Sequence, residues 1–377
     1  MSRPGHISRV LLTLAIWWPI LHGCGALGRH APPEWIEGTS KAHPPDQYLV
    51  GVGRGDSAPV AAEKAYAAVA KIFKAEVTAQ SRDWESFLLV ENRATAKSER
   101  RLTVDQVTNV STDKVIENVR VLETWVEAKT VAHYALAGLN RAQAGAAMQE
   151  RIADLDRTVD GQIQEARRSS HKLTRIRSLR RAIKALVLRE AYNADLRIIR
   201  VSGQGVPTPH QVSELTSELE RFLASNFSVS VKVSGDQEEA VRRAVTEGLL
   251  REGLPVVNAP AGSAEEPGRP SELSVNGTVR LWKVDVPDPH FRYVRWCSDF
   301  IIVEHDAQLV VGAVSRSGKE GHLSHGEASA KAVRAMQQEV TAELAKTLAG
   351  YVYGEDEPPT NPPPAACPRG DGVGDRQ

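Results

Sequence analysis

Apolar and polar residues alternate along the chain in a pattern that predicts a sheet-and-helix region on each side of a long helical segment. In the first region, residues 48–52 form a short apolar run that is typical of a strand. An Ala-rich helix is predicted next, with a buried stripe at helical spacing: Ala62, Ala65, Val69, Ile72, Phe73 and Val77. After a polar stretch over about 80–115, residues 119–141 have the pattern of strands. A first α/β domain is therefore expected over residues 46–141.

The middle of the chain, residues 142–195, is predicted to be helical and is rich in charge. Two apolar stripes run through it: Met148, Ile152, Leu155 and Val159, then Leu173, Ile176, Leu179, Ile183, Leu186 and Leu188. Ser169 and Ser170 offer a weak break between the stripes, so a helical hairpin and one long arm both fit. Residues 197–201 are then expected to form a strand.

Residues 196–353 are predicted to form a second α/β domain. A helix is expected to begin at the Thr208-Pro209 pair, and residues 229–233 alternate like a strand. Further strands are expected over 273–284 and 299–314, the latter with one polar face.

Two more helices are expected in this second domain. Asp236 and Glu239 have the spacing of a capping box, and Gly253 is placed to end the helix that they begin. A last helix stops at Gly350, and the Pro-rich residues 354–377 should be disordered.

The expected fold class is mixed, α+β or α/β, with two small sheet-and-helix domains joined by a long charged helical hairpin or arm.

The first 23 residues have the features of a bacterial lipoprotein signal. Arg3 and Arg9 precede an apolar run, residues 10–21, which has the length of a signal-peptide core and is too short to span a bilayer. The run ends in Leu21-His22-Gly23-Cys24, which fits a lipoprotein cleavage site except that His22 is not small. We expect cleavage before Cys24 and lipid on Cys24; an ordinary secretory signal with an incidental cysteine is the alternative.

The residues after the cysteine predict where the protein is held. Gly25 stands where an Asp would retain a lipoprotein at the inner membrane, so the expected location is the outer membrane, facing the periplasm. Each buried methylene of the acyl chains would contribute about 0.8 kcal/mol to anchoring. Residues 24–45 contain four prolines and are expected to form a tether, within which Trp35 is a candidate anchor on the first domain.

Composition adds three constraints. The 377 residues are enough for roughly two domains with linkers. The chain has 47 Lys plus Arg and 47 Asp plus Glu, so its overall charge does not indicate nucleic acid as a partner. With Cys24 acylated, Cys297 and Cys367 remain, and in an oxidising compartment a disulfide and two separate thiols are both open.

The first domain resembles the LPP-twenty lipoprotein family and the related N-terminal domain of flagellar assembly protein T. The shared features are Pro33-x-Trp35, the run from Tyr48 to Gly53, the Ala-rich helix, the strand from Val119 to Trp125, and Tyr134-Ala135-Leu136-Ala137-x-Leu139-x-Arg141. The resemblance implies an envelope or surface lipoprotein with an assembly or unassigned role. It implies no catalytic residues.

Two motifs are candidates for binding chemistry. Gly51-x-Gly53-x-Gly55 lies between a strand and a helix, where phosphate-binding loops occur, but the spacing differs from G-x-G-x-x-G and no Walker Lys follows. A tight strand-to-helix turn needs glycines equally. His322, His325 and Glu327 offer two imidazoles and a carboxylate near a helix start, whereas a metal site needs three or four converging ligands. A solvated loop is the alternative there.

Basic residues are densest in the helical segment: Arg167, Arg168, Lys172, Arg175, Arg177, Arg180, Arg181 and Lys184. They are suited to anionic lipid, lipopolysaccharide or an acidic partner. The favoured alternative is a solvated surface balanced by acidic residues on the companion helix: Glu150, Asp154, Asp156, Asp160 and Glu165.

These patterns predict a non-enzymatic envelope lipoprotein that binds envelope proteins or peptidoglycan, with no cofactor, metal or nucleic acid. The alternatives are a hydrolase built around His290, Glu304 or His322, and a metal-binding protein that uses the histidines near residue 322. His305 is expected on the apolar side of its strand as a core histidine. Trp282 and Trp296 fit a core or an interface equally.

Overall fold

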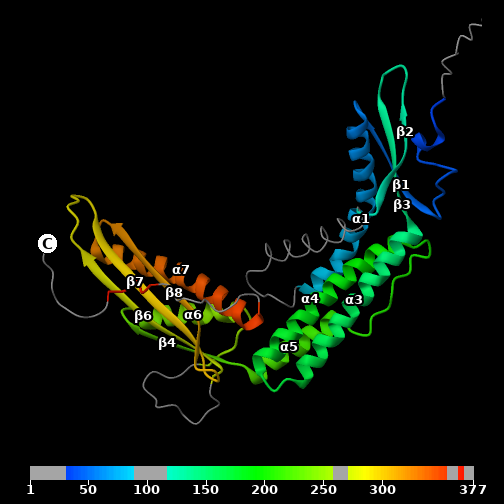
Figure 1. Cartoon of the computed structure of the whole chain (residues 1–377). Helices are drawn as coiled ribbons and strands as arrows, with labels where there is room; N and C mark the ends of the chain where they lie inside the picture. Colours follow the sequence, from blue (N-terminus) through cyan, green and yellow to red (C-terminus); the bar gives the residue numbers. More distant parts are fainter. Residues whose placement is uncertain (1–30, 89–116, 258–270, 355–363, 369–377) are drawn as a thin grey trace, which may run out of the picture.

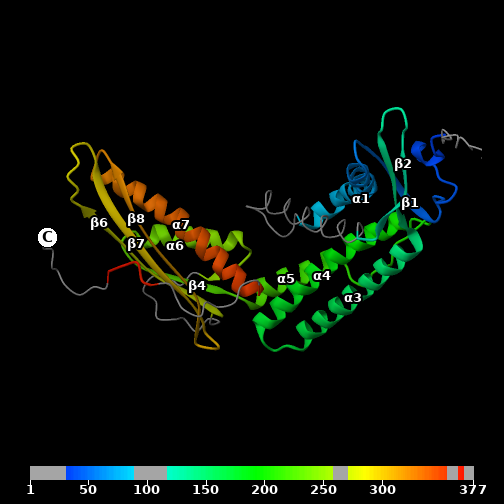
Figure 2. The same ribbon diagram turned by 45° about the horizontal axis from the view of Figure 1, so that its top comes forward.

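The computed structural model describes residues 31–88, 117–257, 271–354 and 364–368. Within them the chain forms two open sheets with accompanying helices, which confirms the mixed α+β class (Figure 1). A helical hairpin lies between the two sheets, as the turned view also shows (Figure 2). None of the helices in these ranges combines the length and hydropathy that a membrane-spanning segment needs.

The first sheet is antiparallel and has the order β1-β3-β2. Its strands are β1 (Tyr48–Gly55), β2 (Val119–Val126) and β3 (His133–Asn140). Helix α1 (Ala58–Leu88) covers one face, and the short 3-10 helix η1 (Glu34–Glu37) lies on the other side (Figures 1 and 2). The polar stretch expected from about residue 80 is therefore still helical as far as Leu88. The remainder of that stretch lies outside the described residues.

The middle segment is a hairpin of α3 (Arg141–Arg168) and α4 (Lys172–Ile199), so the single-arm alternative is wrong. The chain turns at Ser169, whose backbone N–H caps α3 by donating to Glu165 O. The strand expected over 197–201 is also wrong. Leu196 and Ile199 continue the apolar stripe of α4 and are fully buried, so the helix runs on to Ile199.

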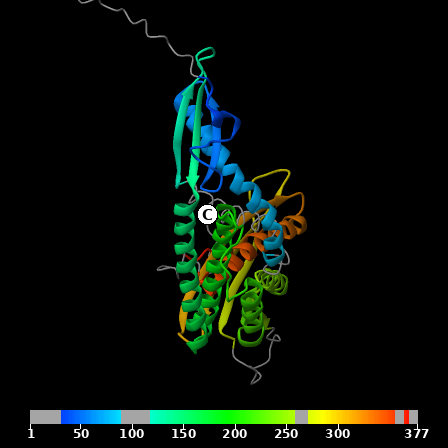
Figure 3. The same ribbon diagram turned by 90° about the vertical axis from the view of Figure 1, so that its right-hand side faces the viewer.

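Each end of the hairpin belongs to a different hydrophobic core. One end packs with α1 and β3 in the first core, through Ala144, Met148, Ile152, Tyr192, Leu196 and Ile199. The other end packs with the second sheet and its helices, through Val159, Ile163, Ala166, Leu173, Ile176, Leu179, Ala182, Ile183 and Leu186. Figure 3 shows the hairpin continuing from the end of the first sheet into the second region. The hairpin is therefore the structural link between the two regions.

The second region contains a five-stranded sheet with the order β5-β4-β6-β7-β8. Its elements are α5 (Val212–Asn226), β4 (Val229–Gly235), α6 (Glu238–Arg251), β5 (Val256–Val257), β6 (Leu273–Val284), β7 (Arg292–Glu304), β8 (Leu309–His322) and α7 (His325–Tyr353). Strand β4 is parallel to β5 and β6, whereas β6, β7 and β8 are antiparallel. Helices α6 and α7 cover one face of this sheet (Figure 1).

Several predicted boundaries in the second region are wrong. The strand expected over 299–314 is the end of β7, a turn and the start of β8, and Gln308 adopts a φ of 51° in that turn. His305 lies in the turn and is exposed, so it is not a core histidine. Helix α5 begins at Val212 rather than at Thr208. Helix α7 continues past Gly350 to Tyr353, and Gly354 follows as its C-cap with a φ of 70° that suits glycine.

The expected capping box is wrong as well. Gln237 is the N-cap of α6 and makes no side-chain capping bond. Asp236 instead accepts a hydrogen bond from the backbone N–H of Leu281 at 2.8 Å, which ties β6 to the end of β4. The expected end of α6 is confirmed, because Gly253 follows the C-cap with a φ of 76°.

Asp195→Asn is expected to remove a pH dependence of stability. Asp195 of α4 is fully buried, and burial raises the pKa of its carboxyl to about 7 from 3.8. The folded chain therefore binds this proton more tightly than the unfolded chain. The stability that results is fully present below about pH 4 and is lost as the pH rises towards about 7. Melting temperatures of the wild type and Asp195→Asn between pH 4 and 8 test this, with exposed Asp306→Asn as control. Parallel curves for the wild type and Asp195→Asn would contradict it.

Candidate functional site

Cys24, the predicted lipid-attachment residue, lies outside the described residues, and Trp35 is the first buried residue that the structure describes after it. The Trp35 side chain is 3% exposed, so its predicted docking on the first domain is confirmed. Gly38 ends η1 with a φ of 90° and donates its N–H to Trp35 O at 2.9 Å. Arg141 holds the next residues, since its Nε donates to Pro45 O at 2.8 Å. The chain is thus fixed to the first domain eleven residues after Cys24.

Trp35→Ala should release the segment that precedes β1. The substitution removes the buried ring that holds η1 on the sheet, while the cores of α1 and β3 stay intact. Limited proteolysis should then cut between residues 33 and 46 at least about tenfold faster than in the wild type, because local opening controls cleavage there. Trp282→Ala, a tryptophan on the other sheet, is the control. An unchanged cleavage rate in Trp35→Ala would refute this role of the indole.

The three glycines of β1 serve packing. A Cβ on Gly51 would lie 2.8 Å from the backbone O of Ala65 on α1. A Cβ on Gly53 would overlap backbone atoms of both Ala61 and Ala65. The helix lies directly against the strand at this point, so it occupies the space that a phosphate group would need.

His322 and Glu327 form a helix-capping pair. Ser324 is the N-cap of α7, and its Oγ accepts from the Glu327 N–H at 3.2 Å. The Glu327 carboxylate accepts from Ser324 Oγ at 2.9 Å and contacts His322 Nδ1 at 2.8 Å. These two contacts hold the pKa of Glu327 below its usual value. Within the described ranges, no group of three or more His, Cys, Asp or Glu is placed to hold a metal ion.

The residues considered for a hydrolase lie at opposite ends of the second sheet. Glu304 ends β7 opposite Leu309, whereas Arg292 begins β7 opposite His322. Twelve residues of extended strand separate these positions by about 40 Å. Glu304 is buried and accepts a hydrogen bond from Tyr351 Oη at 2.8 Å. The structure therefore does not bring Glu304 together with His290 or His322.

The basic row spans the end of α3 and the first half of α4, and part of it packs against the second region. Lys172 pairs with the buried Glu272, and Arg175 pairs with Glu218 at 3.3 Å. The Arg175 guanidinium also lies 4.4 Å from the centre of the Phe222 ring. The expected balance by the companion helix is therefore wrong for these residues. Four others remain exposed: Arg167, Arg168, Arg181 and Lys184.

Arg177 joins α4 to the end of α7. Its Nη2 donates to Tyr351 O at 2.8 Å, and its guanidinium lies 4.7 Å from the centre of the Tyr351 ring. A cation is favourable there, because the last carbonyls of a helix carry partial negative charge. Burial and the hydrogen bond to Glu304 raise the pKa of Tyr351. These contacts stabilise the joint between the hairpin and the second sheet.

The face of the second sheet opposite α6 and α7 carries the last described residues of the chain. Cys297 and Cys367 form a disulfide, which settles the open alternative, and Asp299 accepts the backbone N–H groups of Ala366 and Cys367 at 2.7 and 2.9 Å. Nearby, Arg280 Nη1 donates to Pro368 O at 3.0 Å. The tail segment 364–368 is thus fixed on this open face.

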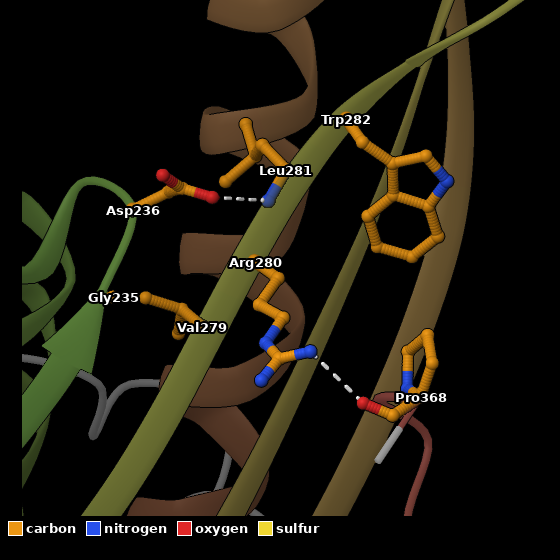
Figure 4. Close-up of a pocket in the computed structure, with 7 residues that line it drawn as sticks. All are labelled: Gly235, Asp236, Val279, Arg280, Leu281, Trp282 and Pro368. Atoms are coloured by element: carbon orange, nitrogen blue, oxygen red, sulfur yellow. Dashed lines mark hydrogen bonds between the residues drawn. The ribbon is translucent and has the colours of Figure 1, made fainter. Parts of the chain in front are cut away.

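A shallow depression of about 530 Å³ adjoins this segment, between the end of β4 and strand β6. Figure 4 shows Trp282 and Pro368 on the same side of β6, with Arg280 reaching towards Pro368. Trp282 is 36% exposed, whereas Trp296 is buried in the core. The sequence did not predict this location, because it depends on the pairing of β4 with β6 and on Pro368, which lies in the tail that was expected to be disordered.

Comparison with known proteins assigns the region of the first sheet and its helix α1 to a family. Residues 33–140 match the LPP20 lipoprotein family. The LPP20 domain therefore begins beside the docked Trp35 and ends with β3, as the resemblance of the sequence predicts. It accounts for less than a third of the chain.

Solved structures give weaker similarities. The secreted protein HP1454 from Helicobacter pylori is 14% identical with a TM-score of 0.36, and the alignment covers 79% of this chain and 97% of that one. A minor lipoprotein from Acinetobacter baumannii is 12% identical with a TM-score of 0.22, covering 35% and 95%. Rare lipoprotein B from Shewanella oneidensis is 13% identical with a TM-score of 0.19, covering 34% and 92%. No curated protein matches the chain. At these TM-scores the similarities carry no further conclusion.

Proposed function

We propose that this chain is an outer-membrane lipoprotein, anchored by lipid on Cys24 and facing the periplasm, that acts as a non-enzymatic assembly or partner-binding module. One observation carries the proposal: the LPP20 lipoprotein domain follows the Leu21-His22-Gly23-Cys24 signal directly, and Trp35 is docked on it eleven residues after the cysteine. The family match and the signal are separate features of the chain, and both support a lipoprotein.

The docked Trp35 limits how far the LPP20 domain can move from the bilayer. Eleven extended residues span at most about 40 Å. A domain held within that distance of the membrane meets membrane-bound partners at a high effective concentration, so weak contacts suffice for assembly. The hairpin connects this domain to the second sheet. The partners that both regions could contact are peptidoglycan and envelope proteins.

The arrangement of polar side chains supports a non-enzymatic role. Glu304, His322 and Glu327, which were candidates for chemistry, contact Tyr351, each other or the N-terminus of α7. The depression near Trp282 is open and contains one carboxylate, Asp236, which is already bonded to the β6 backbone. These contacts therefore favour a function in binding, through exposed surfaces, over a function in catalysis.

Membrane fractionation of the wild type and Cys24→Ala tests the proposal. The wild type should sediment with the outer membrane, and Cys24→Ala should appear in the soluble periplasm or as uncleaved precursor. A Cys297→Ala and Cys367→Ala double variant is the matched control, because it removes two cysteines and keeps Cys24. A wild type found in the soluble periplasmic fraction would overturn the proposal.

A further inference from the structure

The open face of the second sheet carries a row of one aromatic and two basic side chains. Trp282 of β6 is paired with Arg295 of β7, and Arg295 is paired with Lys319 of β8. Residues that are directly opposite in a sheet project to the same face. The neighbouring Trp296 faces the helices and is buried, so this row projects to the open face, and Arg295 and Lys319 are exposed.

The repulsion between the two cations destabilises the sheet when no ligand is bound. Arg295 and Lys319 are directly opposite each other, and like charges at such positions destabilise a sheet. Within the described part of the chain, neither forms an ion pair with a carboxylate. An anion bound between them would remove this repulsion and would gain charge-assisted hydrogen bonds.

Aromatic groups and a third cation surround the pair. Tyr293 lies two residues before Arg295 on the same face, and Lys319 Nζ lies 5.0 Å from the centre of its ring. Arg280 lies two residues before Trp282 and lines the depression with it (Figure 4). Two carboxylates near this row already have partners, since Asp299 accepts two backbone N–H groups of the tail and Asp288 accepts from Tyr293 Oη.

We propose that this row, which we call the Trp282–Arg295–Lys319 row, binds an anionic glycan of the cell envelope. The flat indole of Trp282 offers an apolar surface for a sugar ring, as amphipathic aromatic side chains do. Arg295 and Lys319 offer donors for a carboxylate or phosphate on that glycan, and the guanidinium suits either group in a bidentate contact. The assignment of the glycan to the envelope rests on the proposed function, whereas the recognition chemistry rests on the sheet register alone.

Calorimetry with the full-length chain in detergent micelles tests this inference with three probes. A muropeptide carries sugar rings and carboxylates, and purified lipopolysaccharide carries phosphorylated sugars. N,N′-diacetylchitobiose, called chitobiose below, carries similar rings without charge. We expect the muropeptide to bind at least about tenfold more tightly than chitobiose, because hydrogen bonds to charged groups are stronger than those between neutral groups. Stronger binding of lipopolysaccharide, with the same dependence on the row, would support the site and identify phosphate as the recognised group.

The variants separate the row from general charge. Arg295→Gln with Lys319→Gln should weaken binding about tenfold or more, and Trp282→Ala should weaken it about fivefold. Lys283→Gln is the matched control, because Lys283 adjoins Trp282 on the same strand and lies on the opposite phase. Circular dichroism of each variant should match the wild type, since all four side chains are exposed.

Three results would overturn the inference: no saturable binding of either anionic glycan, equal affinity for chitobiose, or an equal loss in Lys283→Gln. An oligonucleotide bound as tightly as the glycans would also overturn it, because charge alone would then explain the affinity. Cys24→Ala should keep its glycan affinity. Failure of the lipid anchor and failure of this site would therefore be distinguishable.

Discussion

Gly53→Ala is expected to destabilise the LPP20 domain by about 3 kcal/mol or more. Gly53 lies in β1 opposite Ala135 and faces α1. An added Cβ would overlap backbone atoms of Ala61 and Ala65, which cannot rotate away as the end of a side chain can. The helix would have to move off the strand, and the core formed by its buried stripe would open.

Urea unfolding followed by circular dichroism measures this effect, with Gly161→Ala as the matched control. Gly161 lies in the middle of α3, and a Cβ there meets no atom within 4 Å. Alanine at that helical position should stabilise the chain by about 0.5–1 kcal/mol. The same substitution thus has opposite signs at the two sites. A Gly53→Ala variant as stable as the wild type would contradict the close packing of α1 on β1.

Arg189→Met is expected to destabilise the joint between the two cores by about 3–5 kcal/mol. Arg189 of α4 is fully buried, and its guanidinium makes three contacts. Its Nε donates to Asp156 Oδ1 at 3.0 Å, its Nη1 to Glu190 Oε1 at 2.7 Å and its Nη2 to Pro207 O at 2.9 Å. Methionine keeps much of the volume but leaves two carboxylates and a carbonyl without this donor.

Arg189→Met is expected to destabilise the middle of the helical hairpin specifically. Arg189 lies in α4 between Leu186, which belongs to the second core, and Tyr192, which belongs to the first. Hydrogen exchange should therefore rise in the middle of both hairpin helices, while the strands of both sheets keep their protection. Arg181→Met, an exposed arginine on the same helix, is the control and should change stability by less than about 0.5 kcal/mol. Equal stability of the two variants would contradict the structural role of Arg189.

Elements with a clear local period could be predicted from the sequence. The stripe of α1 and the two stripes of the hairpin identify helices, because apolar residues at a spacing near 3.6 lie on one face. The short apolar run at residues 48–52 and the strand-like pattern over residues 119–141 identify the strands of the first sheet. The glycines of β1 fit both a phosphate loop and a packed strand, and only the position of α1 distinguishes them.

Features that depend on long-range pairing could not be predicted. The end of β7 and the start of β8 were expected as one strand, because Glu304, Asp306 and Gln308 alternate with apolar residues and continue the strand pattern across the turn. The Cys297–Cys367 disulfide joins residues 70 apart and needs the fold to bring them together. Likewise, Trp282, Arg295 and Lys319 become neighbours only through the register of three strands. Cys24 is the reverse case, since the prediction of lipid there rests on the sequence alone.

Metabolic incorporation of labelled fatty acid tests the central claim most directly. Wild-type chain and the Cys297→Ala, Cys367→Ala double variant should both carry the label, because both keep Cys24. Cys24→Ala should carry none and should leave the outer-membrane fraction. A wild-type chain without label would contradict the account, and so would label that persists in Cys24→Ala.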